Sequence, residues 1–244
     1  MAISFDGDDH LTKDYSGTGP ISSYPFTMAA WFKPPEEYKD WQGFVLSDGT
    51  ETARYGMGPA NYGRWAIYRQ DIEKRTAANY YTDSSPNDWT QSTCIFNAQA
   101  DRKLYVNGSL AISDGGNIGV TTLTDADVIG FGFGPTAGSN ELYKGEMAEC
   151  GLWNAALTTA EIDSLNAGFS PLLIRPGSLV GYWPLGGAFS DYIDPIGSNT
   201  LSATGDPTAA AHPRIFYPTS PQIGVPSGTV VPNAMHHYRM LRCS

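Results

Sequence analysis

The sequence predicts an all-β protein built as a sandwich of two sheets, with one short helix and an extended, Pro-rich C-terminal arm. Three observations lead to this fold class. Charged residues make up only 16% of the 244-residue chain, whereas 27 glycines and 17 prolines supply turn formers; a typical soluble protein has about 25% charged residues. Short segments of alternating apolar and polar residues recur between the turns. A single segment carries the signature of a helix start.

The alternation is clearest at residues 26–33. The alternate residues from Phe26 to Phe32 fall on one face of an extended chain and are all apolar, whereas Trp31 falls on the other face. The same pattern, bounded by turn residues, predicts strands at Ala2–Phe5, Phe26–Lys33, Gln42–Ser47, Arg54–Gly58, Arg64–Arg69, Trp89–Phe96, Lys103–Val106, Ser109–Ile112, Val128–Phe133 and Tyr143–Trp153.

A two-residue turn at Asn107-Gly108 predicts a tight hairpin between the strands 103–106 and 109–112. Apolar residues alternate into this dipeptide and out of it. Such a turn needs positive φ at both central residues, which Asn and Gly adopt more readily than other residues. The dipeptide therefore fixes the register of these two strands.

The one predicted helix begins after Thr158. Thr158 and Glu161 have the spacing of a capping box, in which each side chain bonds the other residue's backbone N–H. Ile162 and Leu165 supply an apolar face, and Gly168 is expected to end the helix in a left-handed conformation.

Composition divides the chain near residue 170. Of 25 acidic residues, 22 precede residue 171, and residues 171–244 contain neither Lys nor Glu but ten of the 17 prolines. We expect a β-sandwich over residues 1–170, an additional strand and turn packed on it over 171–206, and an extended arm over 207–244. The arm is too apolar for a solvated tail, so we expect it to dock on a neighbouring protein, with candidate docking residues Arg214, Tyr217, Tyr238, Arg239 and Arg242.

Within about the first 168 residues, three stretches match the sequence pattern of a known family in their order and spacing. They are Ile3–Asp9, Phe26–Pro34 and a closing half made of Leu104–Gly108, Tyr143–Met147 and Leu152–Thr158 with Glu161-Ile162. They resemble laminin-G-like modules of the concanavalin A-like lectin/glucanase superfamily. The resemblance implies a jelly-roll sandwich of two antiparallel sheets, with a concave face that binds glycans in many relatives.

A narrower resemblance involves the run LVGYWPL at residues 179–185, followed by Asp194, Gly197 and Asn199. It is similar to a strand and turn that usually begin laminin-G-like modules but here follow the module, a layout that resembles proteins of tailed bacteriophages. This resemblance implies a virion protein that is assembled in the host cytoplasm. Its partners would be the major capsid protein or other virion subunits, further copies of the chain on the particle, and a host-surface glycan.

The predicted strand 143–153 indicates whether the chain could hydrolyse glycans. Glucanases of the superfamily place two catalytic carboxyls about 5 Å apart on one face, and their motif has Glu, Asp and Glu at alternate positions. The matching positions here are Glu146, Ala148 and Cys150, with Glu149 expected on the opposite face. Two of the three carboxylates are missing, so we expect a protein that is not an enzyme and needs no cofactor.

An acidic cluster at Asp6, Asp8 and Asp9 is the candidate for a metal site. Ca²⁺ takes six to eight oxygen ligands, several of them from carboxylates. The loop that supplies most of them in pentraxins corresponds to residues 134–141, which contain one carboxylate. A pentraxin-type site is therefore not expected. A solvated turn is the preferred interpretation of Asp6–Asp9, and a weak Ca²⁺ site is the alternative.

Aromatic residues in the middle strands are the candidates for stacking on sugar rings. Because aromatic side chains also dominate cores and protein interfaces, a core or interface role is the competing interpretation. The candidates are Tyr55, Tyr62, Trp65, Tyr68, Tyr80 and Tyr81.

The remaining features limit partners and compartment. A net charge of −10 argues against nucleic acid, and the apolar runs are shorter than the ~20 residues of a membrane span. The first residues lack a signal-peptide pattern, and three cysteines do not form a disulfide framework. We expect a non-enzymatic phage virion protein, chiefly a capsid decoration protein attached through its arm. The alternatives are a carbohydrate-binding adhesin on a tail, head fibre or cell surface, and a secreted glucanase.

Overall fold

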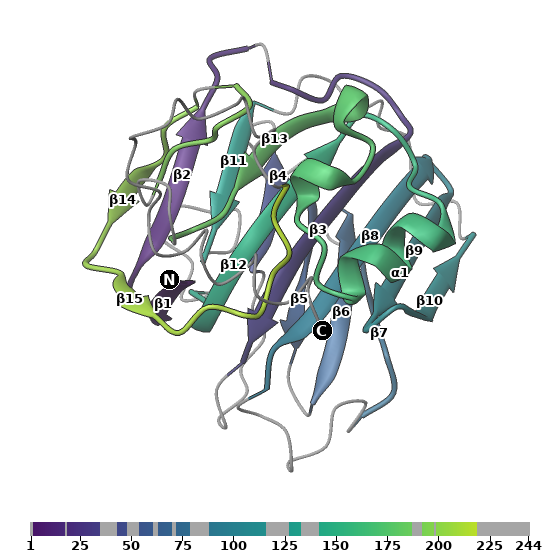
Figure 1. The fold of residues 1–244 in the computed structure, drawn as a ribbon. Coiled ribbons are helices and arrows are strands. Elements are labelled where there is room, and N and C mark those ends of the chain that lie inside the picture. The colour runs from purple at the N-terminus through teal and green to yellow at the C-terminus, as the bar shows by residue number, and fades with distance from the viewer. Residues whose placement is uncertain are drawn as a thin grey trace, which may run out of the picture.

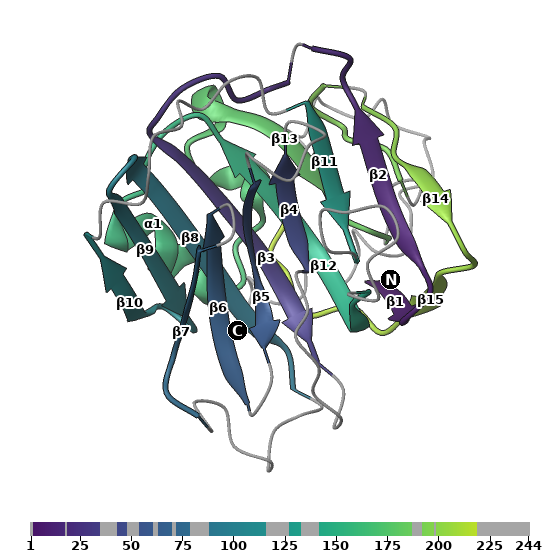
Figure 2. The same ribbon diagram turned by 180° about the vertical axis from the view of Figure 1, so that it is seen from behind.

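Two antiparallel sheets packed face to face form the body of the protein (Figures 1 and 2). The computed structural model describes residues 2–17, 19–34, 43–47, 54–60, 63–69, 72–78, 88–115, 127–132, 142–186, 192–197 and 199–218. Within these residues the predicted jelly-roll sandwich with a single α-helix is confirmed.

Eight strands form the first sheet, which we call sheet A. The longest of them, β12, pairs with β1 through its first half and with β13 through its second half. The strand order is β10 (Ser109–Asp114), β9 (Asp101–Val106), β8 (Thr90–Ala98), β3 (Phe26–Lys33), β12 (Lys144–Trp153), β1 (Ala2–Asp6) and β15 (Thr208–Ala210), with β13 (Leu179–Trp183) beside β12.

Seven strands form the second sheet, sheet B. Strands that follow each other in sequence often belong to different sheets, as β1 and β2 do, so the sandwich is held by pairings between distant parts of the chain. The order is β14 (Ser202–Thr204), β2 (His10–Asp14), β11 (Val128–Phe131), β4 (Phe44–Ser47), β5 (Arg54–Ala60), β6 (Arg64–Arg69) and β7 (Ile72–Arg75).

The sequence located most of the longer strands. The predicted segments Phe26–Lys33 and Arg64–Arg69 coincide with β3 and β6. Asn107 and Gly108 have φ values of 48° and 76°, which confirms the predicted hairpin. Sequence reasoning missed β2, β7, β14 and β15, which have three to five residues each and are too short for a clear alternating pattern.

The main core fills the space between the sheets and is rich in aromatic rings. Phe26 stacks on Phe96 with ring centroids 4.7 Å apart, and Phe44 lies at the same distance from Phe131. The alternate residues of β3 from Phe26 to Phe32 all belong to this core, as the sequence predicted. Burial of this apolar surface, at about 25 cal/mol per Å², is the main force that holds the two sheets together.

A second apolar cluster covers the outer face of sheet A. The helix α1 (Thr159–Asn166) buries Ile162 and Leu165 there against Ile95 of β8. The predicted capping box is present: the Glu161 N–H donates to Thr158 Oγ1 at 3.4 Å, and the Thr158 N–H donates to Glu161 Oε2 at 2.7 Å. Two short 3₁₀ helices, η1 (Pro171–Leu173) and η2 (Pro176–Ser178), lead from α1 to β13.

The residues after position 170 complete the sandwich. Trp183, Leu185 and Leu201 are buried in the main core. The strand β15 lies at the edge of sheet A, and β14 lies at the edge of sheet B (Figure 1). The composition boundary near residue 170 therefore separates two kinds of sequence, but the first 170 residues do not contain the whole core.

Asp194 organises the turn that follows β13. Its carboxylate is fully buried and accepts hydrogen bonds from the N–H groups of Tyr182, Ile196 and Gly197 and from the Asn199 side-chain amide, at 2.8–3.1 Å. A Cβ on Gly197 would lie 2.8 Å from an Asp194 carboxylate oxygen, so a larger residue would not fit. This network is the physical basis of the motif Asp194, Gly197 and Asn199.

None of the helices among the described residues has the length and apolar character needed to cross a bilayer.

Replacing Asp194 with Ala should lower the free energy of unfolding by about 3 kcal/mol, because four donors, three of them buried or partly buried backbone N–H groups, lose their acceptor. Denaturant-induced unfolding of the full chain would measure the change. Asp206→Ala, which removes an exposed carboxylate, is the control and should change the value by less than about 0.5 kcal/mol. Equal effects of the two substitutions would contradict this role for Asp194.

Candidate binding groove on the outer face of sheet A

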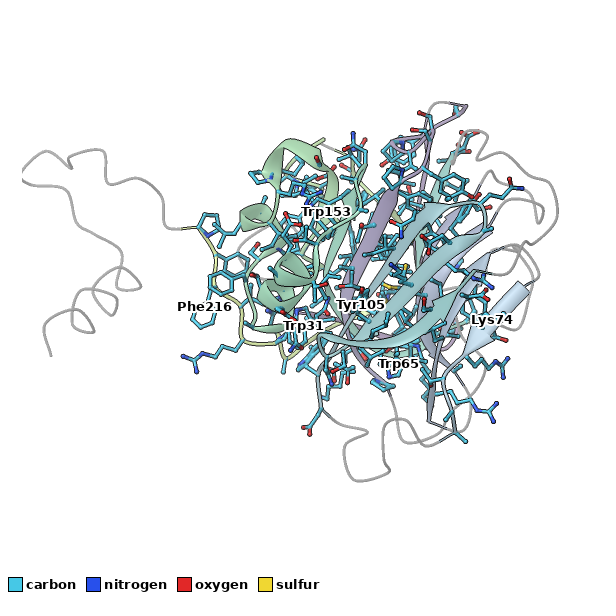
Figure 3. All side chains as sticks on the ribbon, turned by 90° about the vertical axis from the view of Figure 1, so that its right-hand side faces the viewer. Trp31, Trp65, Lys74, Tyr105, Trp153 and Phe216 are labelled. Carbon is cyan, nitrogen blue, oxygen red and sulfur yellow. The ribbon has the colours of Figure 1, made fainter. Side chains whose placement is uncertain are left out.

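A shallow hollow of about 400 Å³ lies on the outer face of sheet A, beside the C-terminal end of α1. Two tryptophans line it together with the end of α1 and a segment near residue 214. Figure 3 shows Trp31 and Phe216 on the flank that carries α1, away from Lys74 of β7. The lining residues are Trp31, Trp89, Asn166, Ala167, Gly168, Pro213, Arg214 and Phe216.

The two tryptophans share a face because of strand register. Trp31 points away from the interior because its neighbours in β3, Ala30 and Phe32, point into the main core. In the register of β3 and β8, Trp31 lies opposite Gln91, and Trp89 precedes Gln91 by two residues. Residues two apart on a strand point the same way, so both indole rings are on the outer face, and both are partly exposed.

The position of the groove residues Arg214 and Phe216 depends on Gly168. This residue has φ +90° and ends the helix as the sequence predicted. The Phe216 N–H donates to the Gly168 carbonyl at 2.7 Å, and the Ser170 N–H donates to the Phe216 carbonyl at 3.0 Å. A Cβ on Gly168 would lie 2.7 Å from the Arg214 carbonyl oxygen. Glycine therefore permits the chain near residue 214 to lie directly against the helix end.

Arg214 is the charged residue of this groove. Its side chain is exposed, and its guanidinium group lies over the Phe216 ring, 5.6 Å from the ring centroid. With the Asn166 amide, it offers several N–H donors close to two indole rings. A mostly apolar hollow with a few convergent polar groups is the usual form of a small-ligand site. Indole faces and N–H donors together suit a saccharide, which presents C–H faces and hydroxyl oxygens.

The structure corrects the aromatic candidates taken from the sequence. Tyr55 and Trp65 are buried in the main core, and the Tyr55 hydroxyl lies 2.8 Å from the Tyr24 hydroxyl. Tyr68 is buried in a small cluster with two alanines. These three rings cannot stack on a sugar, so the core interpretation holds for them. Tyr62, Tyr80 and Tyr81 lie outside the described residues.

Sequence reasoning did not select Trp31 or Trp89, although a signal for Trp31 was present. The alternation in residues 26–33 places Trp31 on the face opposite to the core, where a large aromatic side chain needs another partner. Trp89 and Arg214 join it only through strand pairing and through the path of the C-terminal segment, which no local pattern reveals.

The candidate docking residues Arg214 and Tyr217 contact their own chain. Arg214 lines the groove, and the Tyr217 hydroxyl donates to Glu149 Oε1 at 2.7 Å. Residues 208–217 thus lie on the sandwich, because β15 pairs with β1 and Phe216 bonds to Gly168. The other docking candidates, Tyr238, Arg239 and Arg242, lie outside the described residues.

Glu149 occupies a β-bulge that the sequence did not reveal. It has φ 55°, and the register of β12 against β3 shifts between Ala148 and Gly151. The extra residue breaks the simple alternation, so Cys150 points into the main core and does not share a face with Glu146, contrary to the prediction. Glu146 instead forms an ion pair with Lys33 at 2.9 Å.

The Glu149 side chain is completely buried under the C-terminal segment. It accepts hydrogen bonds from the hydroxyls of Tyr182 and Tyr217, each at 2.7 Å, and lies 3.2 Å from His212 Nε2. Burial, together with the nearby Glu149 carboxylate, raises the pKa of both tyrosine hydroxyls well above their usual range. Both tyrosines therefore remain protonated donors over the whole physiological pH range.

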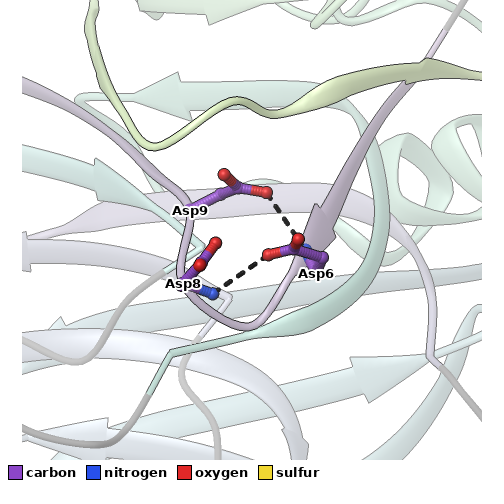
Figure 4. A group of neighbouring side chains, drawn as sticks. All are labelled: Asp6, Asp8 and Asp9. Atoms are coloured by element: carbon purple, nitrogen blue, oxygen red, sulfur yellow. Dashed lines mark hydrogen bonds between the residues drawn. The ribbon is translucent and has the colours of Figure 1, made fainter.

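The acidic cluster near the N-terminus forms a hydrogen-bonded turn (Figure 4). Asp6 accepts from the Asp8 N–H, and the buried Asp9 accepts from the N–H groups of Asp6 and Asp206, at 2.6–3.2 Å. The hydrogen bond between the Asp6 and Asp8 side chains raises the pKa of Asp8 and lowers that of Asp6. These bonds are those of the expected turn, and the alternative of a weak Ca²⁺ site stays a prediction.

Comparisons with known proteins place the fold in a family. A family model described as the concanavalin A-like lectin/glucanases superfamily matches residues 5–163. No curated protein sequence matches the chain.

Solved structures with the same fold include three that are similar over most of this chain. A presumed carbohydrate-binding protein from Bacteroides ovatus has a TM-score of 0.61 at 19% identity, covering 85% of this chain and 58% of its own. A heptameric SAP-like pentraxin from Limulus polyphemus has a TM-score of 0.56 at 16% identity, covering 85% and 93%. Domain 4 of an arabinanase from Geobacillus stearothermophilus, solved with arabinotriose, has a TM-score of 0.51 at 16% identity, covering 68% and 76%. This chain thus spans little more than half the length of the Bacteroides protein.

Replacing Gly168 with Ala should detach the segment 213–217 from the helix end. An L-residue at this φ costs about 1–2 kcal/mol, and its Cβ would press on the Arg214 carbonyl oxygen. We expect the free energy of unfolding to fall by about 2 kcal/mol and proteolysis after Arg214 to become faster. Gly177→Ala is the control, because a Cβ there meets no atom within 4 Å. Equal stability of the two variants would show that the segment does not depend on Gly168.

Proposed function

Because this chain belongs to the concanavalin A-like lectin/glucanase superfamily, we propose that it is a carbohydrate-binding protein whose ligand lies in the groove beside Trp31 and Trp89. The observation that carries this proposal is the pair of partly exposed indole rings on one sheet face, in the same hollow as Asn166 and Arg214. The family fold supports it, as do the carbohydrate-related proteins among the similar structures.

The proposed role is binding without cleavage. Glycoside hydrolysis needs two carboxyl groups that flank the scissile bond, and the described residues that line the groove include no carboxylate. Glu149 is buried beneath the C-terminal segment, and Glu146 is paired with Lys33. In this proposal the rings supply stacking surface, and Asn166 and Arg214 orient the sugar through hydrogen bonds to its oxygens.

The proposal predicts that the affinity of the protein for a saccharide depends on the two tryptophans. A glycan array with the full chain would identify a ligand, and calorimetric titration would measure its affinity. Trp31→Ala and Trp89→Ala should each weaken binding about tenfold, because each removes a stacking surface worth roughly 1.4 kcal/mol.

Ile196→Ala is the matched control, since this exposed apolar residue is not among those that line the groove. It should leave the affinity unchanged. Saccharide binding that survives both tryptophan substitutions would place the site elsewhere. The absence of competable binding to any glycan would overturn the proposed function.

One observation favours a second candidate function, that of a non-enzymatic virion structural protein. Phe169, Phe216 and Tyr217 are 38–42% exposed, and they lie where the chain continues into the Pro-rich residues 219–244. We propose as this second candidate a capsid decoration protein of a tailed phage, assembled in the host cytoplasm and attached to virion subunits through the C-terminal arm. Exposed apolar side chains next to such an arm would suit a protein partner.

Purified phage particles would test this second candidate. Quantitative mass spectrometry should find the chain in many copies per particle, and immunolabelling should place it on the head. A chain shortened to end at Pro218 should be lost from the particles, because it lacks the arm but keeps every strand found in the described residues. Particles that lack the full-length chain altogether would contradict a virion role.

A further inference from the structure

The groove contains one cation and no carboxylate. Among the described residues that line it, Arg214 alone has a charged side chain. This side chain is exposed, and it forms no hydrogen bond or ion pair with another described residue. The protein as a whole has a net charge of −10. Attraction of an anion to this surface would therefore come from Arg214 itself and not from the overall charge of the molecule.

Two aromatic rings hold the guanidinium group of Arg214 in place. The group lies over the Phe216 ring, 5.6 Å from its centroid, which is within the range of a cation–π contact. The Phe216 ring in turn lies next to the Phe169 ring, with centroids 5.7 Å apart. The backbone that follows Arg214 is also held, because the Phe216 N–H donates to the Gly168 carbonyl at 2.7 Å. A group positioned in advance loses less freedom when it binds a ligand.

A ligand that fills the groove takes water away from this guanidinium group. Removing a charge from water is unfavourable unless an opposite charge or strong hydrogen bonds replace the water. The lining residues supply no carboxylate. Glu149, which lies beneath the same segment, is buried, and its two oxygens accept from Tyr182 and Tyr217. A neutral saccharide would leave Arg214 without a counter-charge, whereas an anionic group on the sugar would supply one.

The shape of the guanidinium group also suits an anionic oxygen pair. It presents five N–H donors in a planar fork that matches the oxygens of a carboxylate, and hydrogen bonds between two charged groups are about twice as strong as neutral ones. Asn166 lines the same groove and adds an amide donor for a neighbouring hydroxyl. A sugar ring with one anionic group would use these donors and the indole rings together.

We propose that the groove binds acidic saccharides, in which a sugar ring carries a carboxylate or a sulfate ester that pairs with Arg214. This inference rests on the proposed function and narrows its class of ligand. The two tryptophans supply stacking surface for a sugar of either kind, and Arg214 selects the charged kind.

Calorimetric titration of the full chain with matched trisaccharides tests this selection. The probes are 1,4-linked trisaccharides of glucose, galactose and mannose, each in a neutral form, a form oxidised at C6 to the uronic acid, and a form sulfated at O6. For the sugar that binds, one or both anionic forms should bind about tenfold more tightly than the neutral form. Comparison of the uronic acid with the sulfate shows which anionic group the groove prefers.

Substitutions of Arg214 separate recognition of charge from stacking. Arg214→Gln should abolish the preference for anionic forms and leave the affinity for the neutral form nearly unchanged. Arg214→Lys keeps the charge without the planar fork and should restore part of the preference. Lys144→Gln is the matched control, because it removes the same charge from an exposed residue that does not line the groove. It should keep the full preference.

Equal affinities of the wild-type protein for the neutral and anionic forms would overturn the inference and retain the proposed function. A preference for anionic forms that persists in Arg214→Gln would also overturn it, since another residue would then recognise the charge. The inference fails as well if none of the trisaccharides binds. In that case the glycan array described above decides separately whether the proposed function fails with it.

Discussion

The β-bulge at Glu149 determines which residues of β12 point into the main core and which point toward the apolar cluster under α1. Before the bulge Met147 points into the main core, and after it Cys150 and Leu152 do so. Without the extra residue, period-two alternation would turn Cys150 outward and Trp153 inward. Instead Trp153 lies under the helix, where its indole N–H donates to the Ile174 carbonyl at 2.8 Å. The strained backbone at Glu149, which costs roughly 1–2 kcal/mol, is offset by the hydrogen bonds of its own side chain.

The bulge also explains why the C-terminal segment lies where it does. A buried carboxylate without partners would be strongly unfavourable, so Glu149 requires donors above the outer face of sheet A. The hydroxyls of Tyr182 and Tyr217 fill that need, and the position of Tyr217 brings Arg214 and Phe216 to the end of α1. The β-bulge in β12 therefore helps to determine the shape of the groove.

Local sequence patterns predicted the fold well, and the site poorly, for identifiable reasons. The β3 alternation, the Asn107-Gly108 turn and the Thr158 capping box each depend on a few neighbouring residues, and all three are present in the structure. The bulge could not be predicted because extrapolating a two-residue period through a ten-residue strand assumes that no residue is inserted. The groove joins β3, the residue before β8, α1 and residues 213–216, so only tertiary structure assembles it. Tyr55 of β5 and Trp65 of β6 are buried, so these aromatic residues belong to the core and not to a binding surface.

The pairing of β15 with β1 and of β14 with β2 has a consequence for synthesis of the chain. The N-terminal strands lie at one edge of each sheet until residues 202–210 cover them, and the Asp206 N–H then bonds to Asp9, 197 positions earlier in the sequence. Residues 202–210 must therefore be synthesised before β1 and β2 have their outer neighbours. During translation these open edges can pair with other chains. These contacts between distant parts of the chain should make folding slow. Pairing of β14 and β15 then completes both sheets at that edge and ends the period in which the open edges can aggregate.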